Sequence, residues 1–306
     1  MQGYLSPAYA QSLAEFGTPR QLPRSGGWLL ERSIADTPHR DALGCYPLFS
    51  CADWPALQAD LAALDDELVS VGLVTDPFGN YTEEELYGSF NRVLRFKEHF
   101  LVDLSRDPEE YVSQHHRYYA RRSLRTARFE HCADPAAHLD EWVALYQVLI
   151  ERHELRGLKA FSRESFARQL QVPGLVMFRM IDTETGEGVA AHLWYVQGDV
   201  AYSHLTAFSE AGYRSSASYG LYWSAIDFWR RDLSGGVRRL NLGAGAGVAA
   251  DATDGLTRFK RGWSTETRPA YFCGRILNRS RYEELARHRA PPETNYFPAY
   301  RAGELA

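Results

Sequence analysis

Lysine is scarce in this sequence. The chain has 34 Lys and Arg residues against 39 Asp and Glu residues, a net charge of −5, which excludes a basic coat over the whole surface of the kind that binds nucleic acid nonspecifically. Because only three of the basic residues are lysines, each lysine is a candidate for a specific role. They are Lys97, Lys159 and Lys260.

Cysteine and long apolar runs are also few. The 4 cysteines form no CxxC pair, and no His/Cys cluster has zinc-finger spacing, so the sequence predicts neither structural zinc nor a disulfide scaffold. We therefore expect no metal and a reducing, cytoplasmic location. No apolar run approaches the ~20 residues that a membrane-spanning helix needs. The first residues lack the basic and apolar segments of a signal peptide.

The composition is otherwise typical of globular proteins, with 45% hydrophobic and 13% aromatic residues. Its charge is unevenly spread along the chain. Residues 53–86 carry nine acidic residues and no Lys or Arg, whereas residues 214–301 carry fifteen basic residues against eight acidic ones. This asymmetry favours an anionic ligand in the C-terminal half.

The first half of the chain mixes predicted strands and helices. Apolar runs between turn residues predict strands, and leucines at helical spacing predict a helix over 55–67. Pro108 is expected to start a helix that runs to about residue 128. Further helices are expected over 138–152 and 163–171. The predicted strands are 28–34, 45–50, 68–74 and 92–104.

The second half predicts a more regular order. Three strands joined by tight turns precede a helix that starts near residue 216 and stops at Gly235. A strand, a short helix and a last strand follow. Because a helix separates the strands 200–208 and 237–242, these two cannot form a hairpin, and a crossover connection is implied. The elements after residue 172 are strands 175–181, 189–196, 200–208, 237–242 and 271–277 and the short helix 254–262.

Two segments resemble one known family. FLVDLSRDPEEYVSQHHRYYARRSLRTAR (100–128) resembles the helix that joins the two halves of Fem-type aminoacyltransferases. RRLNLGAG (238–245), followed by GLTRFKRGW (255–263), resembles the strand, glycine loop and Phe-Lys ending of that family. The order of elements is similar to the second half of the GNAT acyltransferase fold. The chain thus resembles the FemAB-like branch of the GNAT superfamily over roughly residues 28–278.

This resemblance implies an α+β fold with two tandem GNAT-like domains, each a mixed, mostly antiparallel sheet flanked by helices, and a cleft between them. We expect an N-terminal domain over 1–107, linking helices over 108–172 and a C-terminal domain over 173–306. The implied activity is amide formation by an N-acyltransferase, with aminoacyl-tRNA or acyl-CoA as the donor and no further cofactor. We expect transfer from aminoacyl-tRNA to a small amine acceptor.

Lys260 matches the lysine of the family's Phe-Lys motif, and the resemblance implies that it faces the donor carbonyl or a phosphate. An ammonium group suits a developing oxyanion. The alternative is a solvated lysine on a short helix. Arg258 and Arg261 flank it, and either one of them binds phosphate or both are solvated.

Arginines also recur at helical spacing along 117–128. Arg117, Arg121 and Arg125 would form one stripe on a helix, continued by Arg128, and no acid interrupts 114–128. Such a stripe suits an RNA backbone or nucleotide phosphates. The alternative is an exposed helix face paired with acids of residues 53–86.

Three polar residues are candidates for handling the acceptor amine. His204 and Tyr202 share one face of their strand, and we expect one of them to relay the amine proton, although a core histidine is the commoner outcome. With a two-residue turn at 198–199, His192 and His204 point to opposite faces. Asn241 ends its strand before the glycine loop and either binds the acceptor or caps the loop.

The segment before the central helix bears on the donor. Acyl-CoA-dependent GNAT enzymes usually place Q/R-x-x-G-x-G/A there, so that backbone N–H groups meet the pyrophosphate. Here Arg214 matches the start of the motif, but Ala217 and Tyr219 replace glycines. Tyr219 would crowd a pyrophosphate, which favours aminoacyl-tRNA over acyl-CoA.

Two other classes of function are kept as alternatives. Gly245, Gly247 and Ala250, with Glu266 further on, formally match a dinucleotide fingerprint, but no βαβ pattern surrounds them. A GNAT-fold protein without activity, which only binds a partner, is the second alternative.

Overall fold

The computed structural model describes residues 1–64, 67–231, 236–245, 254–291 and 293–304. The chain forms two compact units. Unit 1 contains residues 1–3, 97–155 and 162–268, and unit 2 contains residues 4–96, 156–161 and 269–306. The chain passes from one unit to the other inside two strands, β5 (Arg92–Asp103) and β11 (Glu266–Ile276). The units are therefore not the consecutive segments that we expected, because nothing in a strand's own pattern marks where it leaves one unit.

Unit 1 is built on six strands in the order β5, β10, β9, β8, β7, β6. Strand β10 is antiparallel to β5 and parallel to β9, and the remaining pairs are antiparallel. Helix α9 (Ala217–Arg231) joins β9 to β10, so the predicted crossover is confirmed. The other strands of unit 1 are β6 (Ala127–Cys132), β7 (Leu175–Asp182), β8 (Gly188–Gln197), β9 (Val200–Phe208) and β10 (Arg239–Asn241).

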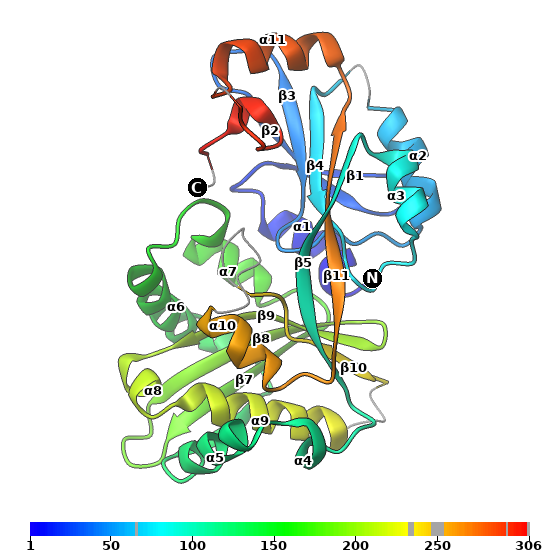
Figure 1. The fold of residues 1–306 in the computed structure, drawn as a ribbon. Helices are drawn as coiled ribbons and strands as arrows, with labels where there is room; N and C mark the ends of the chain where they lie inside the picture. The colour runs from blue at the N-terminus through cyan, green and yellow to red at the C-terminus, as the bar shows by residue number, and fades with distance from the viewer. Residues whose placement is uncertain (65–66, 232–235, 246–253, 292, 305–306) are drawn as a thin grey trace. The chain divides into compact units, whose positions relative to one another are not determined.

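Helices cover both faces of the unit 1 sheet (Figure 1). Helix α9 packs on β6, β7 and β8, and α5 (Gln114–Ser123) packs on α9. Helix α6 (Leu139–His153) covers β8 and β9, with α7 (Arg163–Gln169) against it. The core on the α9 side includes the fully buried side chains of Trp194, Phe178 and Leu240. Each such side chain contributes about 1.5–3 kcal/mol on burial, which fixes the strands that carry the site.

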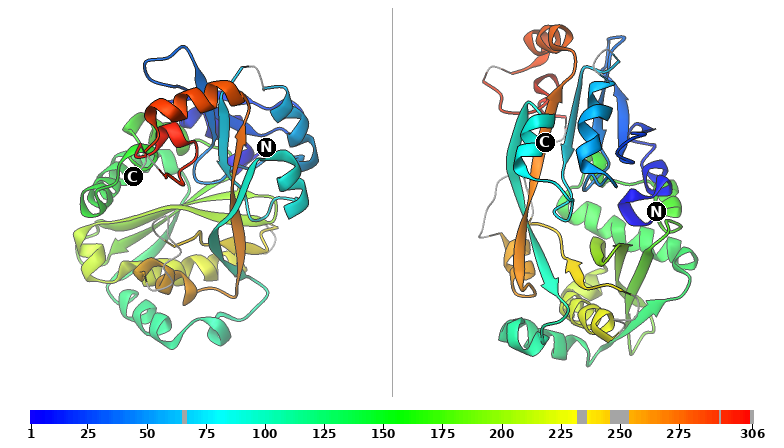
Figure 2. Two further views of the ribbon diagram at one scale, coloured as in Figure 1. Left: turned by 45° about the horizontal axis from the view of Figure 1, so that its top comes forward. Right: turned by 90° about the vertical axis from the view of Figure 1, so that its right-hand side faces the viewer.

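The strands of unit 2 follow the order β1, β2, β3, β4, β11, with β3 and β4 parallel. Helices α2 (Trp54–Ala62) and α3 (Glu83–Ser89) pack together along it (Figure 2) and bury Trp54 and Leu86 in its core. Helix α11 (Arg279–Arg289) buries Leu285 in a smaller cluster. The strands are β1 (Thr18–Gln21), β2 (Trp28–Ser33), β3 (Arg40–Gly44) and β4 (Ser70–Val74), and α1 (Pro7–Ser12) precedes them.

The mixed α/β class with a mostly antiparallel sheet is as predicted, but two local predictions are wrong. Residues 45–50 form no strand, and β3 lies earlier, at Arg40–Gly44. The single helix expected over 108–128 is two helices, α4 (Pro108–Tyr111) and α5, followed by strand β6. The break falls where Ser113 caps α5 with its side chain. Helix α8 (Glu210–Arg214) was not foreseen.

Among the described residues, no helix combines the length and apolar character needed to cross a membrane.

Candidate functional site

Strand register brings His99 and Asn241 together on one face of the unit 1 sheet. Leu101 of β5 lies opposite Asn241 of β10, so His99, two residues before Leu101, projects to the same face as Asn241. His99 Nδ1 lies 3.0 Å from Asn241 Oδ1. The same oxygen accepts a hydrogen bond from the Gly243 N–H at 2.9 Å. Asn241 therefore caps the start of the glycine loop, which is one of the two roles predicted for it.

The two neighbours of β10 reach beyond its end. The parallel pairing of β9 with β10 stops at Tyr202 and Asn241, whereas β9 continues to Phe208. Backbone groups of β9 past Tyr202 therefore have no β10 partner. The end of β10 is consequently one place in unit 1 where the edge of β9 is not covered by its neighbouring strand.

Lys260 reaches this same end of β10 from α10 (Gly255–Arg261). Its Nζ donates a hydrogen bond to the carbonyl oxygen of Ala244 at 2.7 Å. Gly243 makes this approach possible: its φ is +76°, and a Cβ at this position would lie 2.9 Å from Nζ. The lysine of the Phe-Lys motif is thus held against the glycine loop and is not a freely solvated side chain.

Aromatic packing fixes α10. The ring of Phe259 lies 5.0 Å from that of Tyr222 and 5.1 Å from that of Tyr219, both on α9. His116 of α5 contacts the Phe259 carbonyl oxygen through Nε2 at 2.9 Å and Ser113 Oγ through Nδ1 at 2.7 Å. Because Phe259 is anchored on two helices, the neighbouring Lys260 is positioned by the core of unit 1.

Burial shifts the ionisable groups of this site towards their uncharged forms. It lowers the pKa of Lys260 to about 7, Asp254 opposing the effect and Lys97 adding to it. Burial also lowers the pKa of His99 to about 4, with Asn241 opposing and the charges of Lys260 and Lys97 assisting. Two of the three lysines therefore influence one site. Lys97 lies two residues before His99 in β5, on the same face of the strand.

Two buried polar atoms at or near the site have no hydrogen-bond partner among the described residues. They are Nδ2 of Asn241 and Nδ1 of His192. His192 binds Ser203 Oγ through Nε2 at 2.8 Å, and burial places its pKa well below the usual value. A buried donor without a partner costs roughly 1–3 kcal/mol. The amide of Asn241 is thus available to a ligand.

His204 and Tyr202 occupy the same sheet but make core contacts. His204 Nε2 lies 3.1 Å from Gln169 Oε1 of α7, and burial lowers its pKa to about 3. His192 contacts α9 and His204 contacts α7, so the two histidines point to opposite faces, one of the two arrangements that the turn length left open. A β-bulge after Leu193 shifts the register, so that His192 lies opposite Thr206. Tyr202 is buried beside Asn241 in the parallel register. The proton relay by His204 or Tyr202 stays a prediction.

The predicted arginine stripe is shorter than expected. Helix α5 ends at Ser123, so only Arg117 and Arg121 share its face, and Arg125 follows in the turn. Arg117 and Arg121 pair with Glu109. The partner is therefore not an acid of residues 53–86. Arg128, in β6, pairs with Glu130 at 2.9 Å. A surface hollow follows the helix and is lined by Gln114, Arg117, Tyr118, Arg121, Arg122 and Arg125.

The other predicted phosphate ligands are exposed. Arg214 ends α8, and Arg258 and Arg261 lie on the outer side of α10. Tyr219 lies in the first turns of α9, and its ring packs 5.1 Å from that of His116. It thus occupies the helix end where a pyrophosphate would bind. Gly247 and Ala250 of the dinucleotide fingerprint lie outside the described residues.

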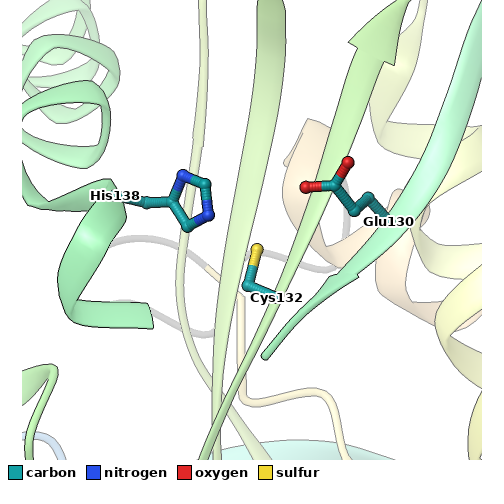
Figure 3. A group of neighbouring side chains, drawn as sticks. All are labelled: Glu130, Cys132 and His138. Carbon is teal, nitrogen blue, oxygen red and sulfur yellow. The ribbon is translucent and has the colours of Figure 1, made fainter. Parts of the chain in front are cut away.

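A second group of polar side chains lies on the edge strand β6 and just after it. Glu130, Cys132 and His138 place one potential metal-ligand atom each within 4.8 Å of one another (Figure 3). Arg179 already occupies this group: its guanidinium lies 2.7 Å from Glu130 and 2.8 Å from Glu141. Burial also raises the pKa of the Cys132 thiol to about 11. The carboxylates are thus neutralised by an arginine, and the group forms an ion-pair cluster.

Sequence reasoning missed His99, His192 and Lys97 as members of the site. A signal for Lys97 was present, because lysine is so rare in this chain. A signal for His99 was its alternation with Lys97 and Leu101 in a predicted strand. All four cysteines are buried free thiols, as expected for a chain without a disulfide scaffold.

Comparison with known proteins agrees with this geometry. Residues 113–261 match the family model "Acetyltransferase (GNAT) domain". The fold is similar to that of FemX, with a TM-score of 0.63 at 14% identity over 91% of this chain and 93% of that one. No curated protein matches.

Two lysylphosphatidylglycerol synthetases are also similar in fold. The C-terminal domain of the putative enzyme from Agrobacterium fabrum has a TM-score of 0.63 at 18% identity, covering 89% of this chain and 88% of that one. L-PGS from Bacillus licheniformis has a TM-score of 0.56 at 14% identity, covering 90% and 94%. The class defined by fold and family model is a GNAT-type acyltransferase fold. FemX and the two other solved structures share this fold with the chain.

Proposed function

We propose that the chain is an N-acyltransferase that transfers an aminoacyl group from aminoacyl-tRNA to the amine of a small acceptor. The observation that carries this proposal is the pair formed by Lys260 and Asn241 at the end of β10. Lys260 is held against the Gly243–Ala244 turn, and Asn241 has a buried amide N–H group with no partner among the described residues. Both can donate to an oxygen that becomes negative.

Amide formation from an ester needs such donors. When an amine attacks the donor carbonyl, its oxygen gains negative charge, and preorganised donors in a buried site lower the barrier. The ammonium form of Lys260 supplies the larger charge, and a pKa of about 7 means that this form is well populated at neutral pH. Lys260 therefore holds the donor carbonyl or a donor phosphate, and Asn241 binds the same group or the acceptor.

Exposed arginines supply the long-range attraction for the donor. Arg117, Arg121 and Arg125 line the hollow along α5, and Arg214, Arg258 and Arg261 lie on the surface of α8 and α10. We assign them to the phosphates of the tRNA 3′ end. Guanidinium groups suit this task because they contact phosphate bidentately. His204 or Tyr202 relaying the amine proton belongs to the same proposal.

The position of Tyr219 favours tRNA over acyl-CoA. In this chain the end of α9 that would receive a pyrophosphate carries a tyrosine packed on His116 and Phe259. One of the similar structures is named as the C-terminal domain of a putative lysylphosphatidylglycerol synthetase, a name that describes an aminoacyl product. A tRNA donor also fits a cytoplasmic location.

Transfer from acyl-CoA is the second candidate. The family model over residues 113–261 is described as an acetyltransferase domain, and this observation favours it. Under this alternative Lys260 would have the same role at the thioester carbonyl.

One experiment separates the two donors. The purified chain is incubated with a pool of amine metabolites and either a mixture of radiolabelled aminoacyl-tRNAs or a set of acyl-CoAs. We expect label from tRNA to enter an alkali-stable small-molecule product, and no release of free CoA thiol above the level seen without protein. Thiol release without label transfer would replace the donor and leave the fold unchanged. The variant Lys260→Met should lose the label transfer. Its matched control is Lys159→Met, which removes an exposed lysine elsewhere in the chain.

A further inference from the structure

His99 is the buried ionisable group at this site whose role the proposed reaction leaves open. Its hydrogen bonding fixes which ring nitrogen carries the proton. Asn241 Oδ1 accepts from the Gly243 N–H, so the side-chain amide cannot be flipped: an NH₂ group at that position would face another donor. Because His99 Nδ1 lies 3.0 Å from this oxygen, Nδ1 must be the protonated nitrogen and Nε2 must carry the lone pair.

His99 and His192 each leave one ring nitrogen without a partner among the described residues, whereas His116 leaves none. His116 uses both ring nitrogens, one on Ser113 and one on the Phe259 carbonyl, as a structural histidine does. His99 uses only Nδ1, and its Nε2 has no partner among the described residues. The residue is nevertheless only 7% exposed. Unlike His192, which binds Ser203, His99 binds Asn241, so its acceptor without a partner among the described residues lies next to the amide that we assign to the substrate.

We propose that His99 is a catalytic residue of the acyl transfer, its Nε2 taking the proton that the attacking amine loses. This inference rests on the proposed function and makes His99, in place of His204 or Tyr202, the group that takes the amine proton. Asn241 then has two roles: its Oδ1 holds His99 in the required tautomer, and its Nδ2 donates to the substrate.

In this reaction one proton moves from the amine to His99 and then to the leaving group. The amine nitrogen forms a bond to the donor carbonyl carbon, and the carbonyl oxygen becomes an oxyanion beside Lys260. His99 Nε2 accepts a proton from the new ammonium centre. The oxyanion collapses, the ester C–O bond breaks, and the imidazolium gives the same proton to the leaving ribose oxygen. The products are an amide and a free tRNA 3′ end, and His99 is neutral again.

The surroundings of His99 make its protonated form short-lived. Burial and the nearby charges of Lys260 on α10 and Lys97 on β5 disfavour the imidazolium, and its pKa is about 4. His99 is therefore a neutral base at working pH. Once protonated it is acidic enough to pass the proton on at once to a departing oxygen.

The first test needs no substrate. In protein with ¹⁵N-labelled histidine, long-range ¹H–¹⁵N correlation spectra report the tautomer of each ring, and His99→Gln identifies the His99 signals. We expect His99 to be the neutral Nδ1–H tautomer from pH 8 down to about pH 5. Below that pH it should begin to gain a second ring proton, because its pKa is about 4. Asn241→Ala should convert His99 towards the Nε2–H tautomer. His204→Gln is the control and should leave the His99 signals in place. An Nε2–H tautomer or an imidazolium at pH 7 in the wild type would overturn the proposal.

The second test uses the transfer assay with radiolabelled aminoacyl-tRNA. Loss of a general base costs about 10²–10⁴-fold in rate, so His99→Ala should lose at least about 10²-fold in kcat. Imidazole in the buffer should restore part of it, which a merely structural loss would not allow. Unchanged turnover, or a loss without rescue in a variant that keeps its fold by circular dichroism, would refute the base. No turnover in the wild type would instead refute the proposed function, while the tautomer result would stand.

Discussion

The two units each bury a polar cluster, and the clusters differ in how their hydrogen bonds are completed. In unit 2, Asp41 receives Arg301 at 2.6 and 2.9 Å and the Tyr300 hydroxyl at 3.0 Å. Ser70 lies 2.8 Å from Tyr300 Oη. Every member is paired. In unit 1, the cluster of His99, Asn241 and Lys260 leaves a donor and an acceptor without partners among the described residues.

We infer that this difference separates a structural cluster from the cluster that we propose as the functional site. A paired buried charge holds strands and the chain end in place, and its carboxylate and guanidinium satisfy each other. An unpaired buried amide lowers stability, and a fold keeps it where a ligand supplies the missing partner. The comparison predicts that substitutions in unit 2 lower stability, whereas substitutions at the end of β10 lower activity.

Removing Asp41 should give the largest effect on stability. Breaking a buried ion pair leaves its partner charge uncompensated, which costs about 3–5 kcal/mol. Arg301 is 10% exposed in its side chain, so Asp41→Ala removes its buried counter-charge and leaves it only the more exposed Glu304 as a partner. We expect the free energy of unfolding, measured by urea denaturation, to fall by that amount. The control is Asp227→Ala, which breaks the exposed pair with Arg231 and should cost about 0.5 kcal/mol. Equal losses in both variants would contradict the comparison.

Replacing Lys260 should give the opposite pattern. Lys260→Met removes a charge that stabilises the oxyanion, and losing one such donor costs about 10²–10³-fold in kcat, or about 2.7–4 kcal/mol of barrier. Stability should not fall, because methionine has no charge to bury. Gly243→Ala should reduce turnover as well, since its Cβ would lie 2.9 Å from Nζ and displace the lysine. Turnover unchanged in both variants would remove Lys260 from the reaction.

The sequence predicted much of unit 1 because its elements have strong local patterns. Helix α6, expected over 138–152, is Leu139–His153, since its apolar residues recur at helical spacing. Lys260 stood out because of its motif and because lysine is rare. Strand β6 was missed because the arginines before it continued a helical spacing that the chain abandons after Ser123.

The assembled site could not be predicted from local pattern. His99 and Asn241 are 142 residues apart and meet only because β5 and β10 pair in a particular register. Nothing within either segment specifies that pairing. The tautomer of His99 depends on a third residue, Gly243, which orients the Asn241 amide. Such polar geometry follows from tertiary structure, whereas helix and strand type follows from neighbours in sequence.

The pH dependence of stability should also distinguish the two clusters. The pKa of Lys260 is lowered from 10.5 to about 7 in the folded protein. Between these values the unfolded chain binds a proton that the folded chain does not, so this group makes unfolding less favourable as pH rises, and stability increases. Below pH 7 its cost is fully present. We expect the difference in unfolding free energy between Lys260→Met and the wild type to shrink from pH 7 to pH 9. A constant difference would mean that Lys260 is not desolvated.

Protonation of buried histidines should also make the free energy of unfolding fall as the pH is lowered. The pKa values of His99 and His204 fall from 6.5 to about 4 and about 3. As pH drops below 6.5 the unfolded chain gains protons first, and stability falls. His204→Gln should reduce the steepness of that fall, measured as urea midpoints from pH 7 to pH 5. An unchanged slope would show that His204 titrates normally.

The smallest effect is expected at the solvated arginines of α5, which resemble neither buried cluster. Arg122 and Arg125 line the hollow and have no carboxylate partner among the described residues. If they contact phosphates, replacing both with alanine should reduce the salt dependence of tRNA affinity by about 0.7 per contact in the log–log slope. The affinity itself should fall severalfold at low salt. The matched control is the double variant Arg163→Ala and Arg168→Ala on α7, which loses the same charge from residues paired with Asp140 and Glu164. Because net charge is equal in the two variants, a slope change confined to the α5 pair would mark local phosphate contacts, and equal changes would mean that only overall charge attracts the RNA.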